Sequence, residues 1–126
     1  MIRRRIACSV MILSCSMSVG AAHAQAASQK ASVDHSDVML FQQAQHAMRQ
    51  SNYAAARSLL ATLIDTHPNS HYVPLAKFSI SDSWYSEHAF RQAELEYQDF
   101  VTFFPHRREV AEAQRRINSI HKESGF

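Results

Sequence analysis

Residues 53–68, YAAARSLLATLIDTHP, decide the fold, because their pattern returns further along the chain. It recurs 37 residues later as residues 90–105, FRQAELEYQDFVTFFP. Each copy begins with an aromatic residue, has an alanine three positions on and a large residue four positions after that, and closes with a proline. A period in the thirties made of two helices is typical of a helical solenoid. The sequence therefore predicts stacked helix pairs that share one core.

The repeated positions have separate structural tasks. Small Ala56 and Ala93 let the two helices of a pair approach closely, and the large residue four positions later fills the space toward the next pair. Pro68 and Pro105 end the second helix of each pair, because proline lacks the amide that a helix interior needs.

Apolar residues at spacings of three and four predict five helices. They are expected at 36–50, 53–66, 72–86, 90–103 and 108–121. No stretch alternates strictly between apolar and polar residues, and no Asn-Gly or Asp-Gly hairpin signal occurs. The fold class is therefore all-α. We expect one domain that consists of two helix pairs and a capping helix, with these bounds: domain 36–122, repeat 37–68, repeat 74–105 and capping helix 108–121.

The first 24 residues have the layout of a secretory signal peptide. A basic segment, residues 1–5 with Arg3, Arg4 and Arg5, precedes an apolar run, and small residues occupy both arms of Ala22-x-Ala24. We expect cleavage after Ala24, an exported protein, and a flexible linker at 25–35, which is rich in Ala, Ser and Gln. An uncleaved anchor is the alternative, although the apolar run is short for a bilayer span.

Both cysteines, Cys8 and Cys15, lie in this leader, so a chain cut after Ala24 has no disulfide and no thiol chemistry. The segment that ends at Cys15 partly resembles a bacterial lipobox, in which this cysteine would carry the lipid. Leu13 stands where a small residue is usual, so lipidation at Cys15 is the second alternative. We therefore expect an exported protein that lies in the periplasm after cleavage at Ala24, or on the periplasmic face of the outer membrane if Cys15 carries a lipid.

The charge balance gives no support for a nucleic-acid partner. The whole chain has 13 Lys and Arg against 11 Asp and Glu, and loss of Arg3, Arg4 and Arg5 with the leader leaves 10 against 11. The basic residues near the end of the chain, among them Arg107, Arg108, Arg115 and Arg116, alternate with glutamates. This pattern favours a solvated, salt-bridged helix over a contact with phospholipid or an acidic partner.

The two repeats resemble the tetratricopeptide repeat, whose unit is about 34 residues long. The turn between its paired helices usually carries glycine, and Ser51-Asn52 and His88-Ala89 stand there in this chain. Longer motifs are similar to the N-terminal repeats of BamD-like proteins, which are tetratricopeptide lipoproteins of the outer-membrane β-barrel assembly machinery. These motifs are Asn52-Tyr53-x-x-Ala56, His67-Pro68-Asn69-Ser70-x-Tyr72, Ile80-Ser81-Asp82-Ser83-Trp84-Tyr85 and Tyr97-Gln98-Asp99-Phe100-Val101-Thr102-Phe103-Phe104-Pro105.

The resemblance covers about residues 40–120. Full members of the family carry about five repeats, so the chain resembles either a short paralogue or a fragment of a family member. It implies a non-catalytic protein-binding scaffold of the bacterial cell envelope. The implied partners are outer-membrane assembly components or unfolded barrel precursors, and the implied membrane contact is peripheral or through a lipid anchor. Related periplasmic repeat proteins of the Tol-Pal cell-division system share the weaker motifs, so a division adaptor is the alternative.

Enzymatic and metal-binding functions have little support in the sequence. His67 and His71 have a spacing that suits a metal on a helix, but Pro68 separates them. Ser81, Asp82, Ser83 and His88 lie close together without any sign of an oxyanion hole. We expect no catalytic residue, no cofactor and no metal, and keep a histidine-based metal-binding protein as the least favoured alternative.

In tetratricopeptide arrays the first helix of each pair lines the concave surface, and the resemblance assigns this position to helices 36–50 and 72–86. Apolar residues on such a face suggest a groove for a peptide. Alternatively, the linker or the closing helix packs there. The predicted protein-binding residues are Phe41, Gln45, Met48, Arg49, Phe78, Asp82 and Tyr85.

Overall fold

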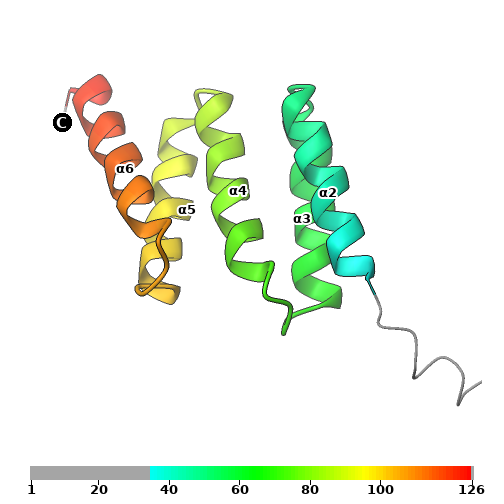
Figure 1. Ribbon diagram of the computed structural model, residues 1–126. Coiled ribbons are helices and arrows are strands. Elements are labelled where there is room, and N and C mark those ends of the chain that lie inside the picture. Colours follow the sequence, from blue (N-terminus) through cyan, green and yellow to red (C-terminus); the bar gives the residue numbers. More distant parts are fainter. Residues whose placement is uncertain (1–34, 126) are drawn as a thin grey trace, which may run out of the picture. The chain divides into compact units, whose positions relative to one another are not determined.

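The computed structural model describes residues 35–125, and this part of the chain is a row of antiparallel helices (Figure 1). They are α2 (Ser36–Arg49), α3 (Tyr53–Thr66), α4 (Val73–Ser86), α5 (Phe90–Phe103) and α6 (Val110–Ser124), and no strand occurs among the described residues. The all-α fold with two helix pairs and a closing helix is confirmed. The predicted signal peptide and nearly all of the predicted linker lie outside the described residues.

The helices form two layers. Each helix packs on the next one along the chain: α2 on α3, α3 on α4, α4 on α5 and α5 on α6. In Figure 1, α2, α4 and α6 lie in front of α3 and α5. We call the surface made by α2, α4 and α6 the inner face, because these helices are the first helices of their repeats.

The core follows the repeat. Ala56 and Ala93 have no exposed surface, and neither do Leu60 and Tyr97, which fill the next position of the pattern. One cluster joins the first pair to α4, and a larger one joins the second pair to α6. The first consists of Ala44, Leu60, Leu63 and Ala76, and the second of Ala93, Tyr97, Phe100, Ala113, Ile117 and Ile120.

The bounds of α6 differ from the predicted 108–121. The helix begins two residues later because Val110 donates its amide to the Arg107 carbonyl across 3.1 Å, which keeps the preceding residues in a turn. It continues to Ser124 because no helix breaker occurs before Gly125, which has a φ of 70°. Smaller differences of one residue occur at the end of α2 and the start of α4.

Each of the two turns within the helix pairs contains one strained residue. Ser51 has a φ of 58° and His88 a φ of 60°, so both occupy the left-handed region in which tetratricopeptide repeats usually place glycine. This conformation costs a residue with a side chain roughly 1–2 kcal/mol. The two positions are 37 residues apart, as the repeat predicts.

We expect Ser51→Gly to stabilise the protein by about 0.5–1 kcal/mol, because relief of the left-handed strain exceeds the entropy that glycine adds to the unfolded chain. His88→Gly should gain less, since the His88 ring meets the Phe90 ring edge-on at 5.5 Å and this contact would be lost. Urea unfolding of both variants measures the difference. A loss of stability in Ser51→Gly would show that the turn is not strained.

Candidate protein-binding face

All seven predicted binding residues lie on α2 and α4, the two first helices of the repeats. Arg49 is exposed at the end of α2, and the other six are half-buried. Phe41 and Phe78 stand at equivalent positions of the two repeats, and so do Met48 and Tyr85. The inner face therefore presents two matched apolar pairs, which remain a predicted binding site.

The two phenylalanines are fixed by rings beneath them. Phe41 stacks on Tyr72 with ring centroids 4.9 Å apart. Phe78 lies 5.8 Å from the Tyr97 ring and 5.4 Å from the Phe100 ring. Both side chains thus contribute to the core, and only part of each ring is available to a partner. Such prior fixing lowers the entropy that a partner's binding would otherwise cost.

A polar contact joins α2 to α4 beside these rings. Gln45 donates its side-chain amide to the hydroxyl of buried Ser79 across 3.2 Å. The equivalent positions in the next repeat are Asp82 on α4 and Arg116 on α6, and these two side chains attract each other electrostatically. Neighbouring first helices are therefore linked through the same pair of positions, once by neutral groups and once by opposite charges.

Asp82 is the central charged group of the inner face. The Tyr97 hydroxyl donates a hydrogen bond to its Oδ1 atom. Burial raises the pKa of the Asp82 carboxyl, while the bond from Tyr97 and the nearby Arg116 guanidinium partly oppose the increase. Burial also raises the pKa of Tyr97, and the hydrogen bond to Asp82 adds to that effect.

Asp82→Asn should become more stable relative to the wild type as the pH rises. Because the carboxyl pKa is raised above its usual 3.8, the folded state holds this proton more tightly than the unfolded state. The resulting stability is complete below 3.8 and is lost as the pH rises through the folded-state pKa. Unfolding free energies at several acidic pH values, with Asp99→Asn on the exposed side of α5 as control, measure the effect. A free energy of unfolding of Asp82→Asn that falls relative to that of the wild type as the pH rises would contradict it.

Arg116 belongs to the inner face, although the alternation of arginines and glutamates around it is typical of a solvated surface. Its guanidinium lies 4.6 Å from the Tyr85 ring centroid, and its Nε donates to Glu112 across 3.0 Å. The signal that could have revealed this role is the repeat itself, since Arg116 stands 37 residues after Ser79. As a result, α6 covers part of the predicted site at Tyr85.

The groups on this face suit recognition of a chain segment. They are aromatic and aliphatic surfaces, one amide, one carboxylate held by a tyrosine, and the Arg49 guanidinium at the edge. Arg49 makes no ion pair with any of residues 35–125, so its charge is available to a partner.

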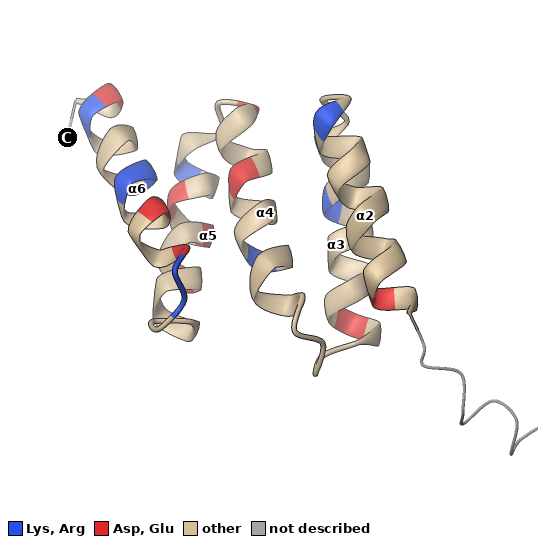
Figure 2. Ribbon diagram, viewed as in Figure 1, with Lys and Arg blue, Asp and Glu red and all other residues tan. Residues whose placement is uncertain are grey.

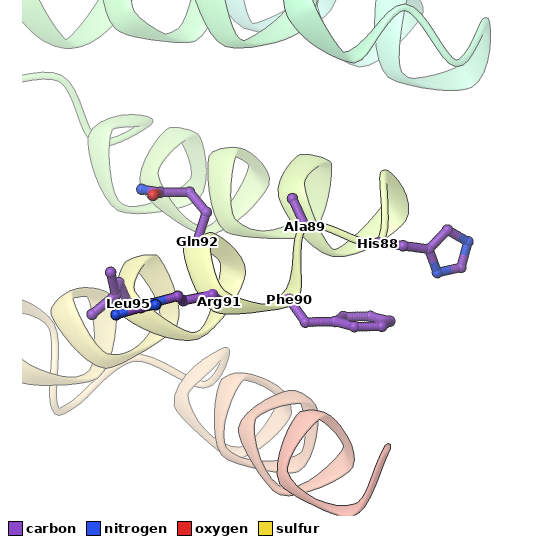
Figure 3. Close-up of a pocket in the computed structure, with 6 residues that line it drawn as sticks. All are labelled: His88, Ala89, Phe90, Arg91, Gln92 and Leu95. Atoms are coloured by element: carbon purple, nitrogen blue, oxygen red, sulfur yellow. The ribbon is translucent and has the colours of Figure 1, made fainter. Parts of the chain in front are cut away.

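A shallow depression lies at the start of α5, and the side chains around it are arranged less regularly than those of the inner face. Figure 3 shows that the side chains around it point in different directions and do not converge on one point. It is therefore a weaker candidate for a binding site. Its lining residues are His88, Ala89, Phe90, Arg91, Gln92 and Leu95.

His67 and His71, the two histidines considered as metal ligands, contact different neighbours. His67 contacts the Ser36 hydroxyl through Nε2 at 2.6 Å, whereas the His71 ring lies 4.0 Å from the Tyr72 ring centroid. Across the described part of the chain, no three His, Cys, Asp or Glu side chains gather as a metal site requires. None of α2 to α6 has the length and hydropathy needed to cross a bilayer.

The stacked helix pairs and the inner face define the class of the protein, which is a helical-repeat scaffold of the tetratricopeptide type. Residues 33–114 match the family model YfiO, described as outer membrane lipoprotein. Because this match covers more than half of the chain, including all of α2 to α5, the protein belongs to the YfiO family. The predicted BamD-like resemblance is confirmed. No curated protein matches the chain.

Proposed function

We propose that the inner face binds a segment of another cell-envelope protein during outer-membrane protein assembly. The observation that carries this proposal is the matched set of half-buried apolar residues on α2 and α4: Phe41, Met48, Phe78 and Tyr85. Large side chains of this kind dominate the energy of protein interfaces. Membership in a family of outer membrane lipoproteins supports a place in the envelope for both partners.

The segment best suited to this face is the aromatic, alternating end of an unfolded barrel precursor. Its apolar side chains would pack on the two matched pairs, and Gln45 can exchange its contact with Ser79 for one with the bound backbone. Arg49 stands at the edge of the face with its guanidinium available for a carboxylate, and such charge-assisted bonds are stronger than neutral ones.

The test measures binding of C-terminal barrel peptides to the wild type and to the Phe41→Ala/Tyr85→Ala variant. We expect at least about tenfold weaker binding by the variant, because each truncation of an anchor commonly costs over about 1 kcal/mol. Leu95→Ala is the matched control, since it removes an exposed apolar side chain from α5, a helix of the other layer.

Phe41 also supports the fold through Tyr72, so a second variant, Met48→Gln, separates lost binding from lost stability. Thermal melts of all variants accompany the binding curves. Equal binding by wild type and both variants would place the site elsewhere on the molecule. Failure of every form to bind would exclude barrel C-termini as the partner class and leave an envelope scaffold with another partner.

A further inference from the structure

The two loops that follow the second helices, residues 67–73 and 104–110, have the same backbone arrangement. In each, the fourth residue donates its amide to the first carbonyl, and the seventh donates to the fourth carbonyl. The N···O distances are 2.9 and 3.1 Å in the first loop and 3.1 and 3.1 Å in the second. Differences in what the loops do therefore arise from their side chains and those of the residues just before them.

The first loop is bound to its own repeat. Ser70 donates its hydroxyl to Asp37 on α2 across 2.5 Å. At the position equivalent to Ser70, the second loop has Arg107, and Phe103 stands where the first repeat has exposed Thr66. The first loop thus directs Ser70 toward its own repeat, whereas the second loop has a guanidinium at that position and follows the aromatic Phe103.

Three large side chains at the second loop project into solvent: Phe103, which is the last residue of α5, and Arg107 and Arg108 of the loop itself. Phe103 is 72% exposed, the highest value among the large apolar residues of the described chain. The Arg108 side chain is 90% exposed, and that of Arg107 is 41% exposed. The half-buried Phe104 anchors the loop by packing its ring 5.5 Å from that of Phe100. The result is a firmly held tip with an aromatic ring and two guanidinium groups.

The charge of this tip is positive. Glu109 is the acidic neighbour of both arginines, at 3.6 Å from Arg107 Nε and 3.1 Å from Arg108 Nε, and its own side chain is only 12% exposed. One carboxylate therefore stands against two guanidinium groups that reach into solvent. In Figure 2, part of the loop before α6 is blue, and the turn that follows α5 is tan.

We propose that the tip formed by Phe103, Arg107 and Arg108 contacts the surface of a bilayer containing anionic phospholipid. The Phe103 ring enters the interfacial layer, and the guanidinium groups bind lipid phosphates. A protein partner is less suitable, because a specific interface buries about 800 Å² on each side around an apolar core, and this convex tip offers one ring. The surface is separate from the inner face and adds a second contact to a protein whose family is found at the outer membrane.

The experiment is cosedimentation of the purified chain, checked by intact mass to carry no acyl group, with vesicles. One set contains phosphatidylcholine alone, and the other also contains phosphatidylglycerol. The test variant gives the second loop the residues of the first: Phe103→Thr, Arg107→Ser and Arg108→His. We expect the wild type to prefer the anionic vesicles and the triple variant to partition at least about 25-fold less, since each of the two arginines near an anionic surface contributes about fivefold.

Leu95→Ser is the matched control, because it removes another exposed apolar residue of α5 and introduces the residue of the first repeat, Ser58. Its partitioning should equal that of the wild type. Equal binding by the triple variant, equal loss in Leu95→Ser, or no preference for phosphatidylglycerol would each overturn the proposal. Binding to polyglutamate without binding to vesicles would also overturn it and indicate an acidic protein partner. Thermal melts confirm that the variants, all at exposed positions, remain folded.

Discussion

A chain that ends at Pro105 is expected to lose its cooperative thermal transition, because α6 covers one side of α5. Without α6, the rings of Tyr97 and Phe100, which are 0% and 2% exposed, would face water on that side. The deletion also removes buried Ile117 and Ile120. Full burial of a large apolar side chain contributes about 1.5–3 kcal/mol, and a domain has only about 5–15 kcal/mol in total.

The same deletion removes the charge that faces Asp82. Without Arg116, the Asp82 carboxylate keeps only the hydrogen bond from the Tyr97 hydroxyl, and that hydroxyl would itself become exposed to water. Circular dichroism melts and amide NMR dispersion measure the result. The matched control replaces two exposed residues of α6, Arg115→Ala and Asn118→Ala, in the full chain. A shortened chain that melts at the midpoint of the full one would show that α6 is dispensable.

Ile117→Ala is expected to lower the free energy of unfolding by about 2–4 kcal/mol, because the side chain is only 5% exposed and its loss leaves a cavity. Ile80→Ala at the equivalent position of the preceding repeat is the internal comparison. Ile80 is half-buried, so its truncation should cost less. Urea unfolding with an unchanged slope establishes both values. Equal losses of unfolding free energy in the two variants would show that the burial of the isoleucine does not determine the cost of its truncation.

Most of the architecture could be predicted from the sequence because the same pattern of residues occurs in both repeats. Pro68 and Pro105 mark the ends of second helices, and Ala56 and Ala93 mark the close approach of paired helices. The end of the chain has no second copy, so the start of α6 was predicted two residues too early. A hydrogen bond from Val110 to Arg107 determines that start, and helical periodicity alone does not reveal such a bond.

The candidate site was predictable in position and less so in contacts. Repeat alignment places Phe41 and Phe78 on first helices, but it does not show that Tyr72 and Tyr97 support them from beneath. The reason is that these tyrosines lie outside the helix that each supports. The hydrogen bond between Tyr97 and Asp82 could not be predicted for the same reason, since it joins residues from the two helices of one pair.

Every major helix contact within residues 35–125 joins neighbours along the chain. Few contacts therefore require the closure of a long loop, and chains with such low contact order fold quickly. The same arrangement makes protection uneven: among the described helices, α3, α4 and α5 each pack between two others, whereas α2 and α6 each pack on one. Amide exchange should be slower in these three inner helices than in the two terminal ones. The helix that carries Phe78, Asp82 and Tyr85 is one of the protected three, so this part of the proposed binding face keeps its shape while the ends open and close.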